Sequence, residues 1–451
     1  MTSPARWAAY EVLRRADTRG AGGQDLASAL AGTRSLVRDP RDRALTTELA
    51  LGVERWRAAL DAIIAAASGR DVGKIDFPAL LSLRLAVFQL KFLTRTPPHA
   101  VVDDAVEIVR RAGAHRAVGF VNGVLRGLLR GGLDAGLPPR PASSADIGGW
   151  TAYLSIALSH PEWLVRRWID RHGPETAEAW ATFDNTPAPL TLRVNTRRIS
   201  VDEARARLET DGVMTSPAPH APHALIVAGG NPMGSPLHDE GLIALMDESS
   251  QLVGALAASV FAAGAVLDAC AAPGGKTLVL ACDLPAGGHV IAADRRPRRL
   301  DLLRRALGRY GLDDVPVVMH DLAKGVPFAA LDGVLVDAPC SGLGTIRRDP
   351  DIRWRRQEAE IAGMAAAQQR MLTQAAAAVR AGGRLVYATC SSESDENEAV
   401  VDAFLAAQPG FRREPIAALR FAPFVDARGD FRTLPHRDGL EAFYAAVLAR
   451  G

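Results

Sequence analysis

Cysteine is scarce in this sequence, and its spacing argues against two common roles. The 451 residues contain four cysteines, at positions 270, 282, 340 and 390. They form no Cys-x-x-Cys pair and no Cys/His spacing suited to zinc, and four are too few for a disulfide framework in so long a chain. We therefore expect no metal site, and we expect any important cysteine to act through its reactivity.

Long hydrophobic runs and a secretion signal are also missing. No apolar run reaches the roughly 18 residues that a membrane-spanning helix needs. The N-terminal Met-Thr-Ser-Pro-Ala-Arg-Trp lacks the charged start and apolar middle of a signal peptide. The sequence therefore predicts a soluble, cytoplasmic protein with no membrane partner. Its 48% hydrophobic residues are enough to fill two or three separate cores.

Net charge is small overall but uneven along the chain. The formal charge is +2, yet residues 1–140 contain 21 Lys and Arg against 14 Asp and Glu. A basic, Arg-rich surface attracts the phosphate backbone of RNA, and the guanidinium group can bind phosphate through two parallel hydrogen bonds. An ordinary solvated helical surface would have the same composition, so charge alone leaves both interpretations open.

Both common phosphate-binding loops are absent, although residues 266–277 have the right local order. This stretch is an apolar run, a Pro-Gly-Gly turn and the start of a helix. A GxxxxGK[ST] loop would need Gly at position 270, and a GxGxxG loop fails because Gly274 and Gly275 are adjacent. The two glycines still allow close approach of a ligand to the backbone, and the helix start offers free N–H groups. The stretch therefore predicts a site for a small polar cofactor.

The periodicity of apolar residues divides the chain into parts. Residues 1–135 show helical periodicity, 136–150 form a linker rich in Gly and Pro, and 151–243 mix helix and strand patterns in a small α+β domain. In residues 244–451, helices alternate with five apolar runs, at 266–268, 290–293, 315–319, 333–336 and 384–388. Such runs predict a Rossmann-like α/β domain with a covered parallel sheet, whose ligands bind beyond the carboxyl ends of the strands.

Residues 268–277, Asp-Ala-Cys-Ala-Ala-Pro-Gly-Gly-Lys-Thr, resemble the first motif of S-adenosylmethionine-dependent RNA cytosine-5 methyltransferases. The resemblance implies that S-adenosyl-L-methionine is the cofactor. Asp294, at the end of the second run, can accept the hydroxyls of a ribose. Asp321 follows the third run, where the resemblance places a carboxylate near the adenine. Helix capping is the alternative role for both acids. The candidate cofactor-binding residues are Cys270, Ala271, Ala272, Pro273, Gly274, Gly275, Lys276, Asp294, Asp321 and Asp337.

Cys340 and Cys390 follow two strands that we expect to be neighbours, and both lie among small polar residues. A thiolate can add to C6 of cytosine, which makes C5 nucleophilic enough to take a methyl group. Asp337, three residues before Cys340, is a candidate for stabilising the charge that develops at N3 and O2. Composition does not assign roles to the two thiols. The resemblance implies that Cys390 attacks and that Cys340 acts as the base that assists release.

Residues 346–356 interleave five arginines with one Trp and resemble an RNA-contacting segment of the same family. The expected RNA-binding residues are Arg347, Arg348, Arg353 and Trp354. A charged surface loop is the alternative. Residues 434–448 resemble the last motif of the family, but Glu441-Ala442-Phe443-Tyr444 departs from its usual Asp-Gly-Phe-Phe. The roles of Glu441 and His436 therefore stay open.

The N-terminal helices resemble NusB-like RNA-binding domains, notably at residues 120–126, Phe-Val-Asn-Gly-Val-Leu-Arg. Residues 151–243, with Ser-His-Pro-Glu-Trp at 159–163, resemble the small RNA-binding subdomain of the methyltransferase family. Together these features resemble the ribosomal RNA small subunit methyltransferase B family. That family implies a protein that makes 5-methylcytosine in 16S rRNA and whose partner is RNA, and we expect it to act as a monomer. A methyltransferase for tRNA or another rRNA site is one alternative. A non-catalytic antitermination or assembly factor that binds RNA is another.

Overall fold

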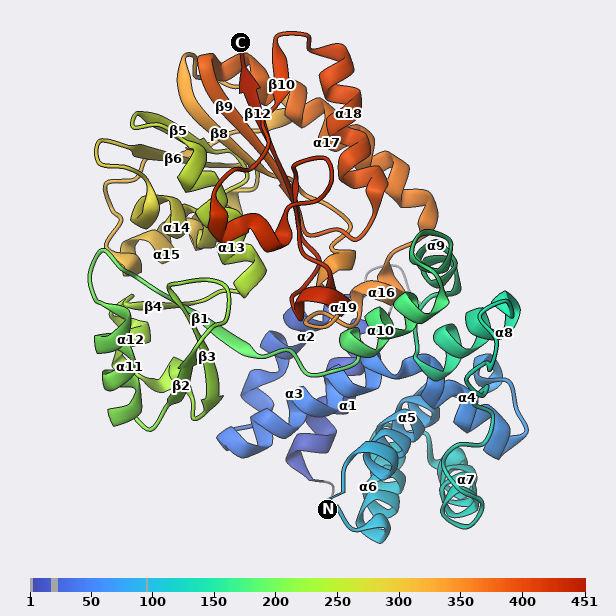
Figure 1. Cartoon of the computed structure of the whole chain (residues 1–451). Coiled ribbons are helices and arrows are strands. Elements are labelled where there is room, and N and C mark those ends of the chain that lie inside the picture. Colours follow the sequence, from blue (N-terminus) through green and yellow to red (C-terminus); the bar gives the residue numbers. More distant parts are fainter. Residues whose placement is uncertain (1–2, 18–22, 95) are drawn as a thin grey trace. The chain divides into compact units, whose positions relative to one another are not determined.

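The computed structural model describes residues 3–17, 23–94 and 96–451 (Figure 1). The chain forms two compact units. Unit 1 combines residues 1–187 with 346–358, and unit 2 combines residues 188–345 with 359–451. Each unit is therefore built from two separate stretches of chain. Within the described ranges, no helix combines the length and apolar character that crossing a bilayer requires.

Unit 1 is helical, as predicted for the N-terminal part of the chain. Its central helix is α5 (Phe77–Phe92), in which every residue from 79 to 89 is buried because apolar side chains occur on all faces. Among the described residues, the helices packed most extensively against α5 are α1 (Pro4–Ala16), α3 (Pro40–Arg55), α4 (Arg57–Ser68), α6 (Pro98–Arg111) and α7 (Val118–Gly131). The short helices α2 (Leu26–Thr33) and α16 (Ile352–Arg355) also belong to this unit.

Residues 151–187 group with the helices of unit 1, whereas the sequence predicted them together with the strands that follow. The apolar faces of α9 (Glu162–His172) and α10 (Pro174–Asp184) explain the difference. Trp168 and Trp180 are buried between these helices, with their ring centroids 5.1 Å apart. Helix α9 also contacts α8 (Ile147–Ala152), which begins inside the expected linker.

Unit 2 contains a small antiparallel sheet of four strands in the order β2-β3-β1-β4. Its strands are β1 (Leu190–Val194), β2 (Met214–Pro217), β3 (Ala224–Gly229) and β4 (Ile243–Leu245). Leu208 of α11 (Val201–Thr210) packs with Leu192 and Val194 of β1, so this helix covers the sheet. The short α12 (Pro236–Asp239) precedes β4. The alternating pattern at 190–196 correctly predicted β1.

The larger sheet of unit 2 has the order β10-β12-β9-β8-β5-β6-β7, and β11 pairs with β12. The five strands from β9 to β7 are parallel and match the five apolar runs. The strands of this sheet are β5 (Ala265–Asp268), β6 (His289–Asp294), β7 (Val317–Met319), β8 (Leu331–Asp337), β9 (Val379–Thr389), β10 (Phe411–Arg413), β11 (Phe431–Arg432) and β12 (Tyr444–Arg450).

Helices cover both faces of this sheet, which is why its parallel strands are apolar on both sides (Figure 1). One face packs against α13 (Glu248–Val260) and α14 (Gly275–Asp283), and the other against α17 (Glu358–Ala378) and α18 (Glu398–Ala407). The helix α15 (Pro297–Tyr310) follows β6, and the short α19 (Pro435–Asp438) precedes β12. After β7 the chain returns to β8 beside β5, so the strand order reverses there, where such sheets bind ligands.

Candidate active site

The turn between β5 and α14 lies at this reversal. Gly274 has a φ of +113°, a left-handed conformation that side chains with a Cβ rarely adopt. A Cβ at Gly274 would also lie 3.0 Å from Cδ1 of Leu303. The Ala271 N–H donates to the carbonyl of Ala293 at 2.9 Å, which ties the turn to the end of β6. The first turn of α14 contains no acidic side chain, so its N–H groups are not capped by a carboxylate of that turn.

Asp268 lies beneath this turn and is fully buried. Its Oδ2 accepts a hydrogen bond from the Thr277 hydroxyl at 2.7 Å, while its Oδ1 has no hydrogen-bond partner within the described part of the chain. Burial raises the pKa of Asp268 to about 7. One oxygen thus holds α14 in place, and the other can accept a hydrogen bond from a ligand group.

Acidic side chains also lie at the ends of β6 and β7, as predicted. Asp294 is 4% exposed, and its Oδ1 accepts from the Arg296 N–H at 3.0 Å. Its Oδ2 lies 3.7 Å from a guanidinium nitrogen of Arg299. Asp321 caps a short helix by accepting from the Ala323 N–H at 3.2 Å. Asp321 therefore makes the helix-capping interaction that is the alternative to adenine binding.

Lys276 links this turn to the end of β8. Its Nζ donates to Oδ2 of Asp337 and to the Ser250 hydroxyl, both at 2.9 Å, and lies 5.6 Å from the ring centroid of Phe443. Burial disfavours the ammonium form, but the charge and hydrogen bond of Asp337, together with Cys390 and Asp268, outweigh burial, and the pKa of Lys276 is raised. A persistent positive charge thus lies beside Asp337.

The two cysteines expected at the sheet edge lie next to each other. The Sγ atoms of Cys340 and Cys390 are 3.3 Å apart, and both side chains are partly exposed. Cys340 follows β8 and Cys390 follows β9, and these strands pair in parallel. The hydrogen bond with Cys340, followed by burial, raises the pKa of the Cys390 thiol, because two adjacent thiols resist losing both protons.

Cys270, in the cofactor turn, has a different environment. Burial, followed by the nearby Asp337, Asp268 and Asp294 carboxylates, raises the pKa of its thiol. Cys270 belongs to the turn after β5 and not to the loops that follow β8 and β9, so it can line a ligand site there.

These side chains fit S-adenosylmethionine in charge and position. The free oxygen of Asp268 and the carboxylates of Asp294 and Asp321 are acceptors suited to the amino and hydroxyl groups of that cofactor. Asp268, Asp294 and Asp321 lie at the ends of β5, β6 and β7, in the same sheet whose strands β8 and β9 precede the two thiols.

The segment after Cys340 behaves differently from the prediction. Arg353 is fully buried, and its guanidinium group donates to the Ser159 carbonyl at 2.7 Å and to Oδ1 of Asn185 at 3.0 Å. The indole N–H of Trp354 donates to the Glu54 carbonyl at 2.8 Å. The expected RNA contact of Arg353 is therefore corrected, because its guanidinium is buried and its two Nη atoms donate to acceptors inside unit 1.

The remaining residues of this segment are less deeply placed. Arg347 is partly buried, donates to the Pro187 carbonyl at 2.8 Å and lies with its guanidinium 4.3 Å from the Phe183 ring centroid. Arg348 is also partly buried. Near the C-terminus, Glu441 is 2% exposed and His436 is exposed.

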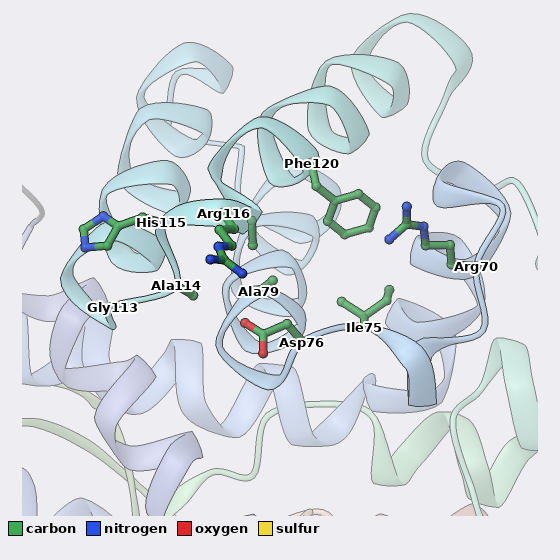
Figure 2. A pocket seen from close by; sticks show the side chains of 10 residues that line it. Arg70, Ile75, Asp76, Ala79, Gly113, Ala114, His115, Arg116 and Phe120 are labelled. Carbon is green, nitrogen blue, oxygen red and sulfur yellow. The ribbon is translucent and has the colours of Figure 1, made fainter.

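Unit 1 contains a separate hollow of about 510 Å³, formed by the start of α5, the loop before α7 and the end of α4. Figure 2 shows Arg70, Arg116 and Phe120 around this hollow. Asp76, the residue directly before α5, also lines it. The guanidinium of Arg70 lies 4.9 Å from the Phe120 ring centroid. Cations and an aromatic ring in one hollow suit a stacked base and its phosphate.

Sequence reasoning missed three side chains around the thiols. Ser250 and Phe443 lie against Lys276, although each is more than 25 residues from it in the chain. Glu396 is one of several acids after Cys390, and no spacing singled it out. Only the tertiary fold brings these side chains to the site.

Comparisons with known proteins cover almost the whole chain. A family model described as 16S rRNA methyltransferase RsmB/F matches residues 260–449. The NusB family model matches residues 3–130, and an RsmF/B-like methyltransferase model of a ferredoxin-like domain matches residues 160–234. The predicted fold class is thereby confirmed, with an all-α NusB-like part, a small α+β part and a Rossmann-like methyltransferase part.

Individual relatives agree with these models. The Probable ribosomal RNA small subunit methyltransferase B of Bacillus subtilis is 34% identical over 91% of each chain. The Putative methyltransferase Rv1407 of Mycobacterium tuberculosis is 37% identical over 99% of this chain and 96% of its own. The solved structure of PH0851 is 25% identical, has a TM-score of 0.80 and covers 99% of both chains.

Proposed function

Because this chain belongs to the family of ribosomal RNA small subunit methyltransferase B, we propose that it methylates C5 of one cytosine in 16S rRNA. As a member it is an S-adenosylmethionine-dependent rRNA methyltransferase. The choice of RNA and cytosine, the covalent step and the roles of individual residues are our proposals.

We propose that Cys390 is the nucleophile. Its thiolate adds to C6 of the target cytosine, so that the C5–C6 double bond becomes an enamine with a nucleophilic C5. Asp337 in its protonated form donates a hydrogen bond to N3, and the Lys276 ammonium, 2.9 Å from Asp337, offsets the negative charge that moves to N3 and O2. When bound, S-adenosylmethionine supplies the electrophilic methyl group that C5 accepts.

Cys340 then completes the reaction. Its sulfur takes the proton from C5, the electron pair re-forms the C5–C6 double bond, and the bond from C6 to Cys390 breaks. The 3.3 Å separation of the two sulfur atoms beside the Lys276–Asp337 pair supports two thiols acting on one ring, and the family resemblance assigns attack to Cys390. A base this close to the nucleophile can reach the proton on the neighbouring carbon.

We propose that Cys270, Ala271, Ala272, Pro273, Gly274, Gly275 and Lys276 line the cofactor site, together with Asp294 and Asp321. The burial of Asp294 at the end of β6 supports a contact with the ribose hydroxyls, since a carboxylate fixed there is a strong acceptor.

For the RNA, we propose that unit 1 binds the backbone and a base near Phe120. The excess of Lys and Arg over residues 1–140 and the hollow between Arg70 and Arg116 support this site. Arg347, Arg348 and Trp354 remain partly exposed candidates for additional contacts. Because Asp337, Cys340 and Cys390 come together within a single compact unit, we also propose that the protein acts as a monomer.

An assay with tritiated S-adenosylmethionine tests this function. We expect label in 5-methylcytosine of naked 16S rRNA, and no label in tRNA incubated in parallel. Label in tRNA alone would favour the alternative substrate. Absence of label from every RNA, with folded wild-type protein, would favour a non-catalytic RNA-binding factor.

A further inference from the structure

A buried polar network lies directly behind the two thiols. Its centre is Glu396, the last residue of a short helix after β9, whose side chain is fully buried. A carboxylate so deep in a protein is costly unless donors surround it. Glu396 therefore needs an explanation that its position along the sequence does not give.

The Glu396 carboxylate connects the residues that follow each catalytic thiol. Oε1 accepts from the Ser341 N–H at 2.8 Å, one residue after Cys340. Oε2 accepts from the Ser391 hydroxyl at 2.6 Å, one residue after Cys390. One side chain is thus hydrogen-bonded to both thiol loops, which come from different strands.

Neighbouring groups hold Glu396 itself in place. Gln368 of α17 donates to Oε1 of Glu396 at 2.8 Å and to the Pro339 carbonyl at 3.0 Å. The Tyr387 hydroxyl donates to the Glu396 carbonyl at 2.6 Å. Asn397 donates to the Ser391 carbonyl at 3.0 Å. The carboxylate therefore has a fixed orientation.

We propose that Glu396 is a positioning residue that sets the distance between the Cys340 and Cys390 sulfur atoms. A carboxylate suits this task because it only accepts, and it can take the Ser341 N–H, the Gln368 amide and the Ser391 hydroxyl together. The consequence for catalysis rests on the proposed function, in which one sulfur adds to C6 and the other removes the C5 proton. A displacement of about 1 Å between such groups can cost roughly 100-fold in rate.

The test compares the full-length wild-type chain with the variants Glu396→Ala, Glu396→Gln and Ser391→Ala. The first readout is the rate at which the oxidant diamide joins Cys340 to Cys390, followed by mass spectrometry. Diamide takes two electrons and two protons from the thiol pair and becomes the corresponding hydrazine. This rate depends on the sulfur separation and needs neither RNA nor cofactor. The second readout is kcat and KM for methyl transfer to 16S rRNA.

Asp332→Asn is the matched control. Asp332 lies at the opposite end of β8, where it accepts from the Ala265 N–H at 2.9 Å and from Arg380 at 2.8 Å. Its replacement also removes a carboxylate that holds a loop, but far along the strand from the thiols. We expect crosslinking and transfer in this variant to stay within about twofold of wild type.

For Glu396→Ala we expect crosslinking to slow at least tenfold and kcat to fall about 100-fold, with KM values within threefold. Glu396→Gln keeps one acceptor oxygen and should recover most of both rates. Ser391→Ala removes only the hydrogen bond from the Ser391 hydroxyl to Glu396 and should slow crosslinking severalfold. This variant tests the proposal if Glu396→Ala does not fold. Crosslinking in folded Glu396→Ala or Ser391→Ala as fast as in wild type would overturn the proposal. Lack of methyl transfer by the wild type would instead contradict the proposed function.

Discussion

At the scale of single residues, the main finding is that two thiols share one small space. Cys340 and Cys390 are 3.3 Å apart at their sulfur atoms, and the Lys276 ammonium lies nearby beside Asp337. Two sulfur atoms this close influence each other's protons, since removal of one proton makes removal of the second harder. Such a pair can supply a nucleophile and a base in turn, because only one of the two thiols is deprotonated at a time.

Alkylation of Cys390 by iodoacetamide should therefore depend on Cys340. The reagent reacts with the thiolate, and the neighbouring Cys340 is the largest cause of the raised pKa of Cys390. In Cys340→Ala that cause is removed, so the pKa of Cys390 falls and the alkylation profile moves to lower pH. Peptide mapping of Cys390 modification between pH 6 and 10 measures the shift. An unchanged profile, or one moved to higher pH, would contradict the coupling.

The sequence predicted some of these residues and missed others for a physical reason. The turn at 268–277 and both cysteine segments are continuous stretches, so their chemistry can be recognised locally. Ser250, Phe443 and Glu396 reach the site through the packing of α13, β12 and a short helix. Phe443 stands in the stretch that resembles the family's last motif, but nothing in that stretch pairs it with Lys276, and the polar sequence around Ser250 and Glu396 gives no signal.

At the scale of elements, the segment 346–358 shows how far composition can mislead. Five arginines and a Trp predicted an RNA-binding surface, yet Arg353 is buried among backbone carbonyls of unit 1. A guanidinium group with five donors suits buried carbonyl groups as well as phosphates. Sequence alone does not distinguish the two uses, because the carbonyls come from residues more than 150 positions away.

Arg353→Ala should destabilise unit 1 by roughly 3 to 5 kcal/mol. The substitution leaves the Ser159 carbonyl and the Asn185 side chain without their donor and removes the cation beside buried Asp184. All seven tryptophans lie in unit 1, so their fluorescence during urea unfolding reports on this unit. Arg355→Ala, which removes a 3.6 Å ion pair with Asp351 at a more exposed position, should cost less than about 1 kcal/mol. Equal effects of the two substitutions would contradict the role of Arg353.

Asp184 should make the stability of unit 1 depend on pH. Burial raises its pKa from 3.8 to about 7, so between these values the folded state binds a proton that the unfolded state has lost. Its contribution to stability is complete below about pH 4 and is lost as pH rises towards 7. Asp184→Asn should remove this loss and stabilise unit 1 at pH 7 by roughly 1 to 3 kcal/mol. Urea unfolding followed by tryptophan fluorescence at pH 5 and 7 measures the free energy of unfolding of both proteins. The same change in that free energy with pH in the wild type and in Asp184→Asn would refute the prediction.

At the scale of the whole molecule, the order of the helical and α/β parts along the chain was predictable. That a later segment of the chain would join the helical part was not. Helical periodicity and the apolar runs predicted a helical part followed by an α/β part, and both are confirmed. No periodicity indicated that residues 346–358 would complete unit 1. That association depends on contacts such as Trp354 with Glu54, which are 300 residues apart.

A fragment of residues 1–187 should therefore be an incomplete unit. Without residues 346–358 it lacks the Arg353 guanidinium and the Trp354 indole, and it exposes the surfaces that they cover. We expect its Tm to rise by several degrees when a synthetic peptide of residues 346–358 is added, and to change little with the Arg353→Ala peptide. If neither peptide changes the Tm of the fragment, residues 346–358 add nothing to the stability of unit 1.

The central claim is that Cys390 forms a covalent bond to the target cytosine and that Cys340 breaks the resulting adduct. The most direct measurement incubates the Cys340→Ala variant with S-adenosylmethionine and 16S rRNA, digests the complex and identifies the modified peptide by mass spectrometry. We predict a stable adduct of methylated cytidine on Cys390, and none in Cys390→Ala, which should also lack turnover. An adduct on Cys340 in the Cys390→Ala variant would reverse the two roles and contradict the account.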